Sequence, residues 1–347
     1  MKKSLLDFIV CPSCGSKLNA GKVAKDEIMS GTLKCRNNHS FPITKGVPSL
    51  LMENALAGSK EEVRNSFGEK WTRIPDFGHD NPQTREYLLQ WYLERYSWKN
   101  ETELKKFLAT RQRVLDAGMG AGGDVSYYAE NTKGQVFGID ISTSVESAYK
   151  HLSKMPNVHL IQTDLTRMPF PKGTFDFIVS HGVLHHTRNT EKSFKYLVDF
   201  LAPDGQIAIY VYKKKSPIRE SCDDFIRGYT TKMTPEECYK FSKAVTRFGK
   251  SLQDLKVEIE VPETIPVLGI EAGKYNLQRF IFWHFLKCYW NDVFDLETNA
   301  MNVYDWYHPK DAFRHTPDEV KQWFWDAGLK ILSFDVNDSG ISVRGIK

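Results

Sequence analysis

Five short apolar runs, separated by stretches with helical spacing, constrain the fold of this chain more than any other feature. They cover residues 113–117, 135–139, 158–162, 175–180 and 206–212. Strands that alternate with helices along a chain are typical of βαβ units, whose strands lie parallel in one sheet. Two final strand-like runs, 331–336 and 341–346, flank an Asn-Asp-Ser-Gly turn and predict a closing hairpin. We therefore expect an α/β fold.

A glycine-rich turn follows the first of these runs. The segment 114–123 reads VLDAGMGAGG, so Asp116 is followed by glycines at every second position, Gly118, Gly120 and Gly122. Glycine permits the positive φ angles of a tight turn and lets a ligand approach the backbone. The GxGxG spacing differs from the GxGxxG of the dinucleotide fingerprint. No Lys-Ser or Lys-Thr pair follows, so a phosphate-cradling P-loop is not expected.

Acids also end the next two strand-like runs. Asp140 stands 24 residues after Asp116, where it can accept hydrogen bonds from both hydroxyls of a ribose. Ile141 can pack on an adenine ring, and Asp164, followed by Leu165, can accept a hydrogen bond from an adenine amino group. Each acid alone is common at strand ends of α/β proteins. Together with the glycine turn, they predict a nucleoside site at the carboxyl ends of the strands.

The order and spacing of these motifs resemble those of class I S-adenosylmethionine-dependent methyltransferases. The resemblance covers 113–212 and returns at 316–347, near the branch that acts on quinones, sterols and other small molecules. It implies a Rossmann-like seven-stranded sheet with one antiparallel strand, formed by 105–212 and 313–347. Together with the acids at the strand ends, it also implies that ten residues surround S-adenosylmethionine: Asp116, Gly118, Gly120, Gly122, Asp140, Ile141, Asp164, Leu165, Ser180 and His181.

Three of the six cysteines gather near the N-terminus. Cys11, Cys14 and Cys35 precede His39 in a C-x2-C-x20-C-x3-H pattern. Two close pairs separated by a loop suit tetrahedral Zn²⁺, and four protein ligands predict a structural role for the metal. A ribbon of about 50 residues has little core of its own, so the metal would contribute folding free energy. The alternative is a degenerate ribbon that folds without metal.

The predicted zinc ribbon, residues 1–50, is similar to two known kinds of ribbon. It resembles the N-terminal ribbon of ribosomal RNA guanine methyltransferases, in which a CPxC pair precedes a Cys-x3-His pair and a Phe. Through 41–43 and 46–48 it also resembles small zinc-ribbon proteins that partner methyltransferases. RNA therefore remains a candidate substrate. Six basic residues form either its contact face or an ordinary solvated surface: Lys17, Lys22, Lys25, Lys34, Arg36 and Lys45.

Composition narrows the function class only moderately. A formal net charge of +4 is small for 347 residues and argues weakly against a dedicated nucleic-acid binder. No segment has 18 consecutive apolar residues, so no membrane span is expected. The apolar N-terminal run is broken by Asp7, which argues against a signal peptide. Scattered single cysteines beside a metal cluster predict reduced thiols and a cytoplasmic protein.

Residues 51–104 are predicted to form a linker and a helical extension. Asn81 followed by Pro82 is typical of a helix start, with Asn81 as the cap. Aromatic residues then recur at helical spacing, and we expect most of them to pack on the next domain. Earlier in this extension, Phe67 and Trp71 are candidates to close over the cofactor.

Residues 213–312 carry helical signals and no strand alternation. Thr234 begins a capping box with proline at the first helical position. We therefore expect a helical insertion after the fifth strand, acting as a lid or a substrate-recognition subdomain. A second capping box at Thr316 predicts the closing helix, over 317–327.

Histidines after the fourth strand are the first candidates for catalysis. His185 and His186 lie on the side to which the methyl group should point, and imidazole is a general base near neutral pH. The alternative is that they form a structural helix start. Tyr307 and His308, with His315, are the second candidates, because they stand in an aromatic, polar run before the closing helix. The alternative there is a polar loop packed on the insertion.

Three functions are compatible with these motifs. The first is a methyltransferase for a small-molecule substrate, with S-adenosylmethionine, a structural zinc and a lid. The second is an RNA methyltransferase that uses the ribbon to bind RNA. The third is a non-catalytic scaffold that retains the cofactor fold, because one fold hosts many functions.

Overall fold

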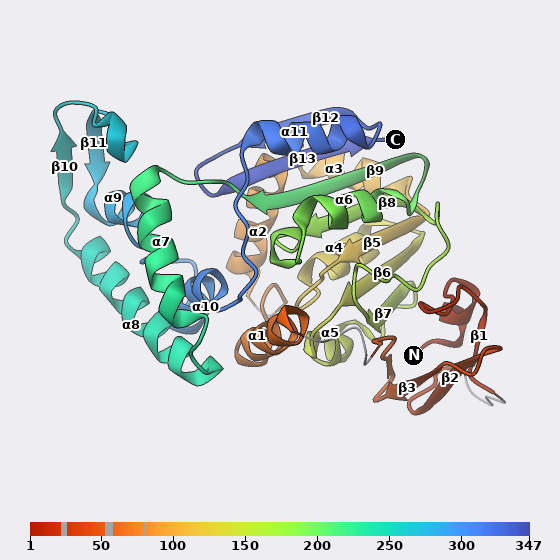
Figure 1. The fold of residues 1–347 in the computed structure, drawn as a ribbon. Coiled ribbons are helices and arrows are strands. Elements are labelled where there is room, and N and C mark those ends of the chain that lie inside the picture. Colours follow the sequence, from red (N-terminus) through yellow and green to blue (C-terminus); the bar gives the residue numbers. More distant parts are fainter. Residues whose placement is uncertain (22–25, 53–57, 80) are drawn as a thin grey trace.

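The computed structural model describes residues 1–21, 26–52, 58–79 and 81–347 (Figure 1). Lys22 and Lys25, two of the basic residues expected on the ribbon, lie outside the described residues. None of the helices in the described ranges has the length and apolar character that a bilayer crossing requires.

A seven-stranded sheet forms the centre of the molecule (Figure 1). The order of its strands is β12-β13-β9-β8-β5-β6-β7. Their bounds are β5 (Arg113–Ala117), β6 (Gln135–Asp140), β7 (Val158–Gln162), β8 (Phe175–His181), β9 (Leu201–Tyr212), β12 (Lys330–Val336) and β13 (Gly340–Ile346). The strands from β5 to β9 pair in parallel, whereas β13 is antiparallel to both of its neighbours. The predicted seven-stranded sheet with one antiparallel strand is confirmed.

Both faces of the sheet are covered, which explains why its central strands are almost wholly apolar. One core packs on α2 (Pro82–Arg95), α3 (Glu101–Ala109), α4 (Gly123–Asn131) and α5 (Ser144–Leu152). The other core packs on the ribbon, α6 (Thr190–Val198) and α11 (Pro317–Asp326). Neighbouring residues of β5 alternate between the two, Val114 in the first core and Leu115 in the second.

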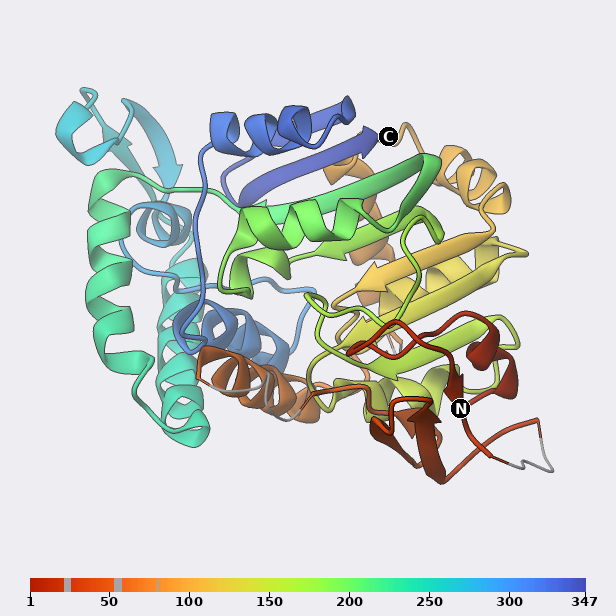
Figure 2. The ribbon, with the colours of Figure 1, turned by 45° about the vertical axis from the view of Figure 1, so that its right-hand side comes forward.

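The N-terminal ribbon lies beside β7, at one edge of the sheet (Figure 2). After the 3-10 turn η1 (Lys3–Asp7) it forms an antiparallel sheet of β1 (Leu18–Asn19), β2 (Gly31–Cys35), β3 (Ser40–Thr44) and β4 (Val47–Pro48). Ser49 then forms a parallel bridge with Gln162, and the Leu50 N–H donates to the Gln162 carbonyl at 2.8 Å. The ribbon therefore covers an edge strand that would otherwise expose unpaired backbone groups.

Residues 213–312 extend from the other side of the molecule (Figure 1). They contain α7 (Pro217–Thr230), α8 (Pro235–Asp254), β10 (Glu258–Val261), η4 (Pro266–Leu268), β11 (Gly273–Asn276), α9 (Leu277–His284) and α10 (Leu296–Tyr307). The antiparallel β10–β11 hairpin corrects the expectation of a helical insertion without strands. Val257, Ile259 and Val261 do alternate with glutamates, but the run is too short and too charged to stand out.

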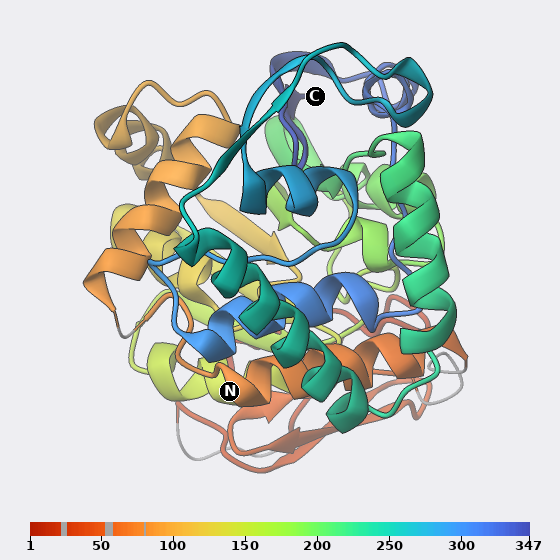
Figure 3. The same ribbon diagram turned by 90° about the vertical axis from the view of Figure 1, so that its left-hand side faces the viewer.

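Helix α1 (Ser59–Arg73) packs beside α10, which in turn packs on α8 (Figure 3). The helix starts follow the predicted chemistry. Asn81 caps α2 by accepting from the Gln83 N–H, and both predicted capping boxes form, at Thr234 and Thr316.

Candidate functional site

A cavity of about 730 Å³ lies where β5, β6 and β8 end. Its walls come from the sheet, from α1 and α2, and from the insertion. It brings together seven of the ten residues predicted to surround the cofactor: Asp116, Gly118, Asp140, Ile141, Asp164, Leu165 and His181. The other three, Gly120, Gly122 and Ser180, lie outside its lining.

The glycine turn is shaped by backbone conformation and by close packing. Gly118 and Gly120 have φ angles of +99° and +53°, which favour glycine. A Cβ atom on Gly118 would lie 2.3 Å from the Val183 side chain, and one on Gly120 would lie 2.4 Å from Trp71. The Gly120 N–H donates to Asp140 Oδ2 at 3.0 Å. Glycine is therefore also required at these two positions because side chains of the protein pack closely against them. The spacing of the glycines does not predict this packing.

Three acids, Asp116, Asp124 and Asp140, form what we call the acidic end of the cavity. Asp116 is 3% exposed, and its carboxyl group makes no hydrogen bond within the described part of the chain. Burial, with Asp124 and Asp140 close by, raises the pKa of Asp116 well above its usual range. Burial also raises the pKa of Asp124 to about 6. A positively charged ligand would relieve this concentration of buried acid.

The acids at the ends of β6 and β7 are held in place by hydrogen bonds from other residues of the protein. Asp140 Oδ1 accepts from the Ser142 N–H at 2.8 Å and from its hydroxyl at 2.7 Å. Asp164 Oδ2 accepts from Lys60 Nζ at 2.5 Å. Lys60 comes from α1, so this helix contacts the predicted adenine position as well as the glycine turn. Phe67 and Trp71 of α1 line the cavity.

His181 and Ser180 have different surroundings at the end of β8. The His181 ring lies 4.9 Å from Trp91 and 5.2 Å from Tyr210, and its Nδ1 is hydrogen-bonded to the Tyr96 hydroxyl at 3.1 Å. Burial lowers the pKa of His181 to about 3, so the ring is neutral at physiological pH. Ser180 donates to the Ala117 carbonyl at 2.9 Å, which ties β8 to β5.

His186 is the one predicted catalytic residue in the cavity lining. Its Nδ1 lies 2.7 Å from the Asp311 carbonyl, and its Nε2 lies 3.4 Å from Asp305 Oδ1. Asp305 Oδ2 pairs with Lys70 Nζ at 2.8 Å. Burial opposes ionisation of Asp305, yet Lys70 and His186 hold its pKa well below the usual range. The His186 imidazole therefore faces a carboxylate that stays ionised at physiological pH.

The other predicted catalytic residues are engaged elsewhere, outside the cavity lining. His185 stacks on Tyr212 at 3.6 Å, and burial lowers its pKa well below the usual range. Tyr307 donates to Asp223 Oδ1 at 2.8 Å, and His308 Nδ1 lies 2.7 Å from the Ser66 hydroxyl. In each case, the side chain is engaged by the protein itself. His315 likewise bonds Thr190, at 2.9 Å.

The four predicted metal ligands lie together in the ribbon. The ligand atoms of Cys11, Cys14, Cys35 and His39 are all within 4.8 Å of one another. Cys14 Sγ and Cys35 Sγ are 3.8 Å apart, and His39 Nδ1 lies 3.3 Å from Cys35 Sγ and 3.5 Å from Cys11 Sγ. Two thiolates at about 2.3 Å from a tetrahedral Zn²⁺ would stand about 3.8 Å apart. The donor set therefore fits zinc in both chemistry and spacing.

Comparison with known families agrees with this geometry. Residues 115–209 match the family described as a methyltransferase domain, and residues 2–46 match Trm112p-like protein. The chain carries a class I S-adenosylmethionine-dependent methyltransferase domain. Ahead of this domain stands a Trm112-like segment that contains the Cys/His cluster.

Relatives of the methyltransferase domain differ in what they act on. Phosphoethanolamine N-methyltransferase 3 of Arabidopsis thaliana is 36% identical over 124 residues, 34% of this chain and 25% of that protein. A ubiquinone/menaquinone biosynthesis C-methyltransferase of Haemophilus ducreyi is 23% identical over 52% of this chain and 76% of that protein. The chain thus spans a quarter of the length of the first relative. A solved magnesium protoporphyrin IX methyltransferase from Synechocystis has a TM-score of 0.44 at 15% identity, covering 85% and 99% of the two chains.

Several residues beside the methyltransferase motifs were missed by sequence reasoning. Lys60, Asp305 and Lys287 line the cavity from α1, α10 and the segment after α9. No local motif marks them, because each reaches the site through packing of elements distant in the chain. Asp305 stands inside the aromatic run that was expected to face the substrate, two residues before Tyr307.

Proposed function

We propose that this chain transfers a methyl group from S-adenosylmethionine to a small molecule. The observation that supports this most is a cavity of about 730 Å³, walled by the predicted cofactor residues and by aromatic side chains of the insertion. Trp283, Trp306 and Phe294 are among the latter. Concave, mostly apolar cavities of this size are typical of small-ligand sites.

The proposed cofactor contacts use the acids at the strand ends. Asp140 would hold the ribose, and Asp164 with Leu165 would hold the adenine. The buried carboxyl groups of Asp116 and Asp124 suit a ligand that carries positive charge. When bound, S-adenosylmethionine supplies an electrophilic methyl group on a sulfonium. The chain itself must align the nucleophile, exclude water and accept a proton.

His186 is the proposed general base. The Asp311 carbonyl accepts a hydrogen bond from Nδ1–H, which leaves the Nε2 lone pair to take a proton. The imidazolium so formed would face Asp305 Oδ1, 3.4 Å away. Neither Nε2 nor Asp305 Oδ1 has a hydrogen-bond partner within the described residues. Asp305 is a positioning residue that stabilises the charged ring.

For the ribbon we propose a structural Zn²⁺ held by Cys11, Cys14, Cys35 and His39. The ligand spacing supports this, as does the small core of the ribbon. Metal content by plasma mass spectrometry should give one zinc per chain. Chelation should lower the melting temperature, and Cys35→Ser should abolish zinc binding. A metal-free chain with the same melting temperature would refute the proposal.

An RNA substrate is the second candidate, favoured by the Trm112p-like match. The position of the ribbon counts against it. The ribbon packs beside β7, whereas the insertion that walls the cavity extends from the opposite side (Figure 1, Figure 2). Among the described residues, none of the ribbon lines the cavity.

Methyl transfer into cell extract tests these alternatives together. Extract is incubated with the protein and methyl-labelled S-adenosylmethionine, then split into small-molecule, RNA and protein pools. Asp140→Ala is the loss variant, and Glu260→Ala, an exposed acid on β10, is its control. We expect Asp140-dependent label in the small-molecule pool. Label in RNA would favour the second candidate, and cofactor binding without label in any pool would favour a scaffold.

A further inference from the structure

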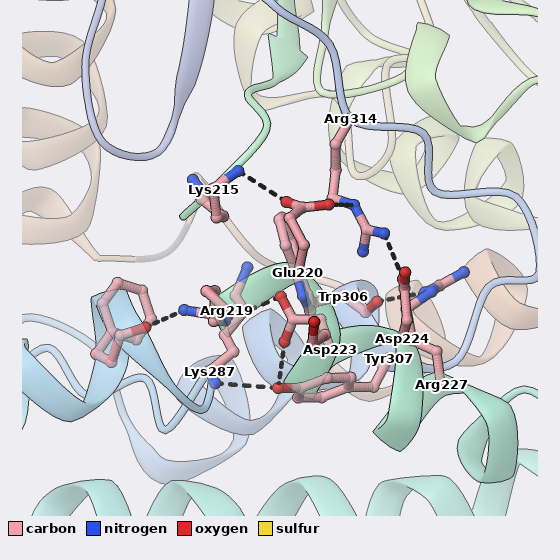
Figure 4. A network of polar contacts seen from close by, with 12 residues as sticks. Lys215, Arg219, Glu220, Asp223, Asp224, Arg227, Lys287, Trp306, Tyr307 and Arg314 are labelled. Atoms are coloured by element: carbon pink, nitrogen blue, oxygen red, sulfur yellow. Dashed lines mark hydrogen bonds and ion pairs between the residues drawn. The ribbon is translucent and has the colours of Figure 1, made fainter. Parts of the chain in front are cut away.

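A group of cations lines the part of the cavity that the insertion builds (Figure 4). Lys215, Arg219 and Lys287, which we call the cationic cluster, come from three different segments and surround the indole of Trp306. Lys287 Nζ lies 4.5 Å from the ring centroid, and Lys215 Nζ and Arg219 Cζ each lie 5.7 Å from it. Aromatic faces stabilise cations but do not neutralise them.

The protein supplies few anionic partners to the cationic cluster. Arg219 is 1% exposed and donates from Nε to Asp223 Oδ2 at 2.9 Å. Lys215 Nζ donates to two backbone carbonyls, those of Asp338 and Ser339. Lys287 Nζ makes no hydrogen bond or ion pair within the described ranges, and its contacts there are with aromatic rings. Within the described ranges, one of the three cations is therefore ion-paired, Arg219 with Asp223, and Asp305 faces Lys287 without forming an ion pair.

Both lysines of the cationic cluster have lowered pKa values, because they are buried among other positive charges. Burial, with a smaller contribution from Arg219, lowers the pKa of Lys287 to about 8, although Asp305 and Asp223 oppose the shift. Burial, with Arg219 and Lys287 nearby, lowers the pKa of Lys215 well below its usual range. Buried ammonium groups that lack a counter-charge are destabilised, and an anion placed among them would offset that cost.

Arg95 adds a fourth positive charge close to the same loop. It is 1% exposed, and its guanidinium carbon lies 3.4 Å from the Trp91 centroid and 3.7 Å from that of Tyr210. Its Nη2 donates to Ser339 Oγ at 2.7 Å, on the residue whose carbonyl binds Lys215. Its Nε and Nη1 are buried without a hydrogen-bond partner among the described residues.

We infer that the substrate carries an anionic group, a phosphate or a carboxylate, which binds at the cationic cluster beside Trp306. This inference rests on the proposed function. It fixes the orientation of the substrate, because the cluster and the His186–Asp305 pair line the same cavity. Aromatic rings of the same lining, among them Tyr212 and Trp283, would pack against the body of the molecule.

Binding of small anions to the full chain, without S-adenosylmethionine, tests the inference. The probes are inorganic phosphate, phenyl phosphate, benzoate and the neutral benzyl alcohol, measured by calorimetry and by tryptophan fluorescence. We expect phenyl phosphate or benzoate to bind about tenfold or more tightly than benzyl alcohol. The stronger of the two identifies the anionic group as phosphate or carboxylate.

Matched lysine variants locate the site. Lys287→Met should weaken anion binding about tenfold or more, because it removes a charge-assisted contact. Lys287→Arg should retain most of it. Lys274→Met removes an exposed lysine of the same insertion, outside the cavity lining, and should leave the affinity unchanged.

Two results would overturn the inference. One is equal binding of the anions and benzyl alcohol, which includes no binding of any probe. The other is unchanged anion affinity in Lys287→Met when its melting curve shows a folded chain. S-adenosylmethionine affinity is measured on the same samples. If the cofactor binds and the anions do not, the inference alone fails. If anions bind and the cofactor does not, the proposed function fails, and with it the assignment of the cluster to a substrate.

Discussion

The two ends of the cavity differ in both construction and charge. The acidic end stands at the ends of strands β5 and β6 and on the first turn of α4, and hydrogen bonds fix Asp140 there. The cationic cluster stands on the insertion, where the segment before α7, α7 itself and the segment after α9 meet around Trp306 of α10. An acidic end suits a positively charged cofactor, and a basic end suits an anionic substrate. Opposite potentials in one cavity would hold two ligands apart and in a defined order.

The largest expected effect is the loss of activity on replacing His186, which lines the same cavity as both ends. His186→Ala should lower kcat about 10²- to 10⁴-fold, because it removes the proposed proton acceptor. The affinities for cofactor and for benzoate should both stay within about twofold, since His186 belongs to neither end. Single-turnover methyl transfer and calorimetry measure the two effects.

His151→Ala serves as the control, because His151 is an exposed histidine outside the cavity lining. Unchanged kcat in His186→Ala would remove the histidine from the mechanism. A parallel loss of both binding affinities would show that it holds the cavity together instead.

The acidic end is tested by Asp140→Ala. Loss of a carboxylate that accepts charge-assisted hydrogen bonds should weaken S-adenosylmethionine binding about 10- to 100-fold. Benzoate binding should not change, because the cationic cluster shares no hydrogen bond with Asp140 among the described residues. If both affinities fall together, the two ends of the cavity are not independent of each other.

The ligand affinities of the two ends should also change with pH in opposite directions. Burial raises the pKa of Asp124 to about 6, so this group is neutral below that pH and a carboxylate above it. A cationic ligand is stabilised by the carboxylate. S-adenosylmethionine affinity should therefore rise as the pH increases from about 5 to about 7, by up to about tenfold per unit. Calorimetry over this range measures it, and a flat profile would contradict it.

At the cationic cluster, ligand affinity should fall rather than rise with increasing pH. Lys287, with its pKa lowered to about 8, is charged below that pH and neutral above it. Asp305 on α10, Arg219 and Asp223 on α7, and Lys70 on α1 are the charged groups that face it. Benzoate affinity should fall as the pH rises from about 7 to about 9, and Lys287→Met should flatten this profile. An affinity that rises over that range would exclude Lys287 as the ligand.

The smallest effect is expected at the ion pair between Lys60 of α1 and Asp164. Lys60 Nζ now occupies one oxygen of Asp164, the proposed adenine acceptor, at 2.5 Å. Lys60→Met should free that oxygen and change S-adenosylmethionine affinity only about two- to fivefold, because a partly exposed ion pair is worth little. A change beyond about tenfold, by titration calorimetry, would mean that α1 governs cofactor entry.

Features that depend on neighbours along the chain can be predicted from the sequence. Strands β5 and β7 begin and end at the predicted residues, because their apolar runs are bounded by turn-forming or polar segments. The caps at Asn81, Thr234 and Thr316 formed as expected, since a cap needs only the first helical turn. The Cys/His spacing likewise predicted four ligands at one site, and their ligand atoms lie together in the structure.

Which side chains meet in the cavity depends on how distant elements pack in three dimensions. His185 and His186 are adjacent, yet one stacks on Tyr212 while the other faces Asp305. Along α10, Asp305 turns toward the cavity and Tyr307 turns toward Asp223, because successive residues of a helix point in different directions. The cationic cluster unites three segments of the insertion. Such groupings depend on how the elements pack, and no local pattern in the chain records that.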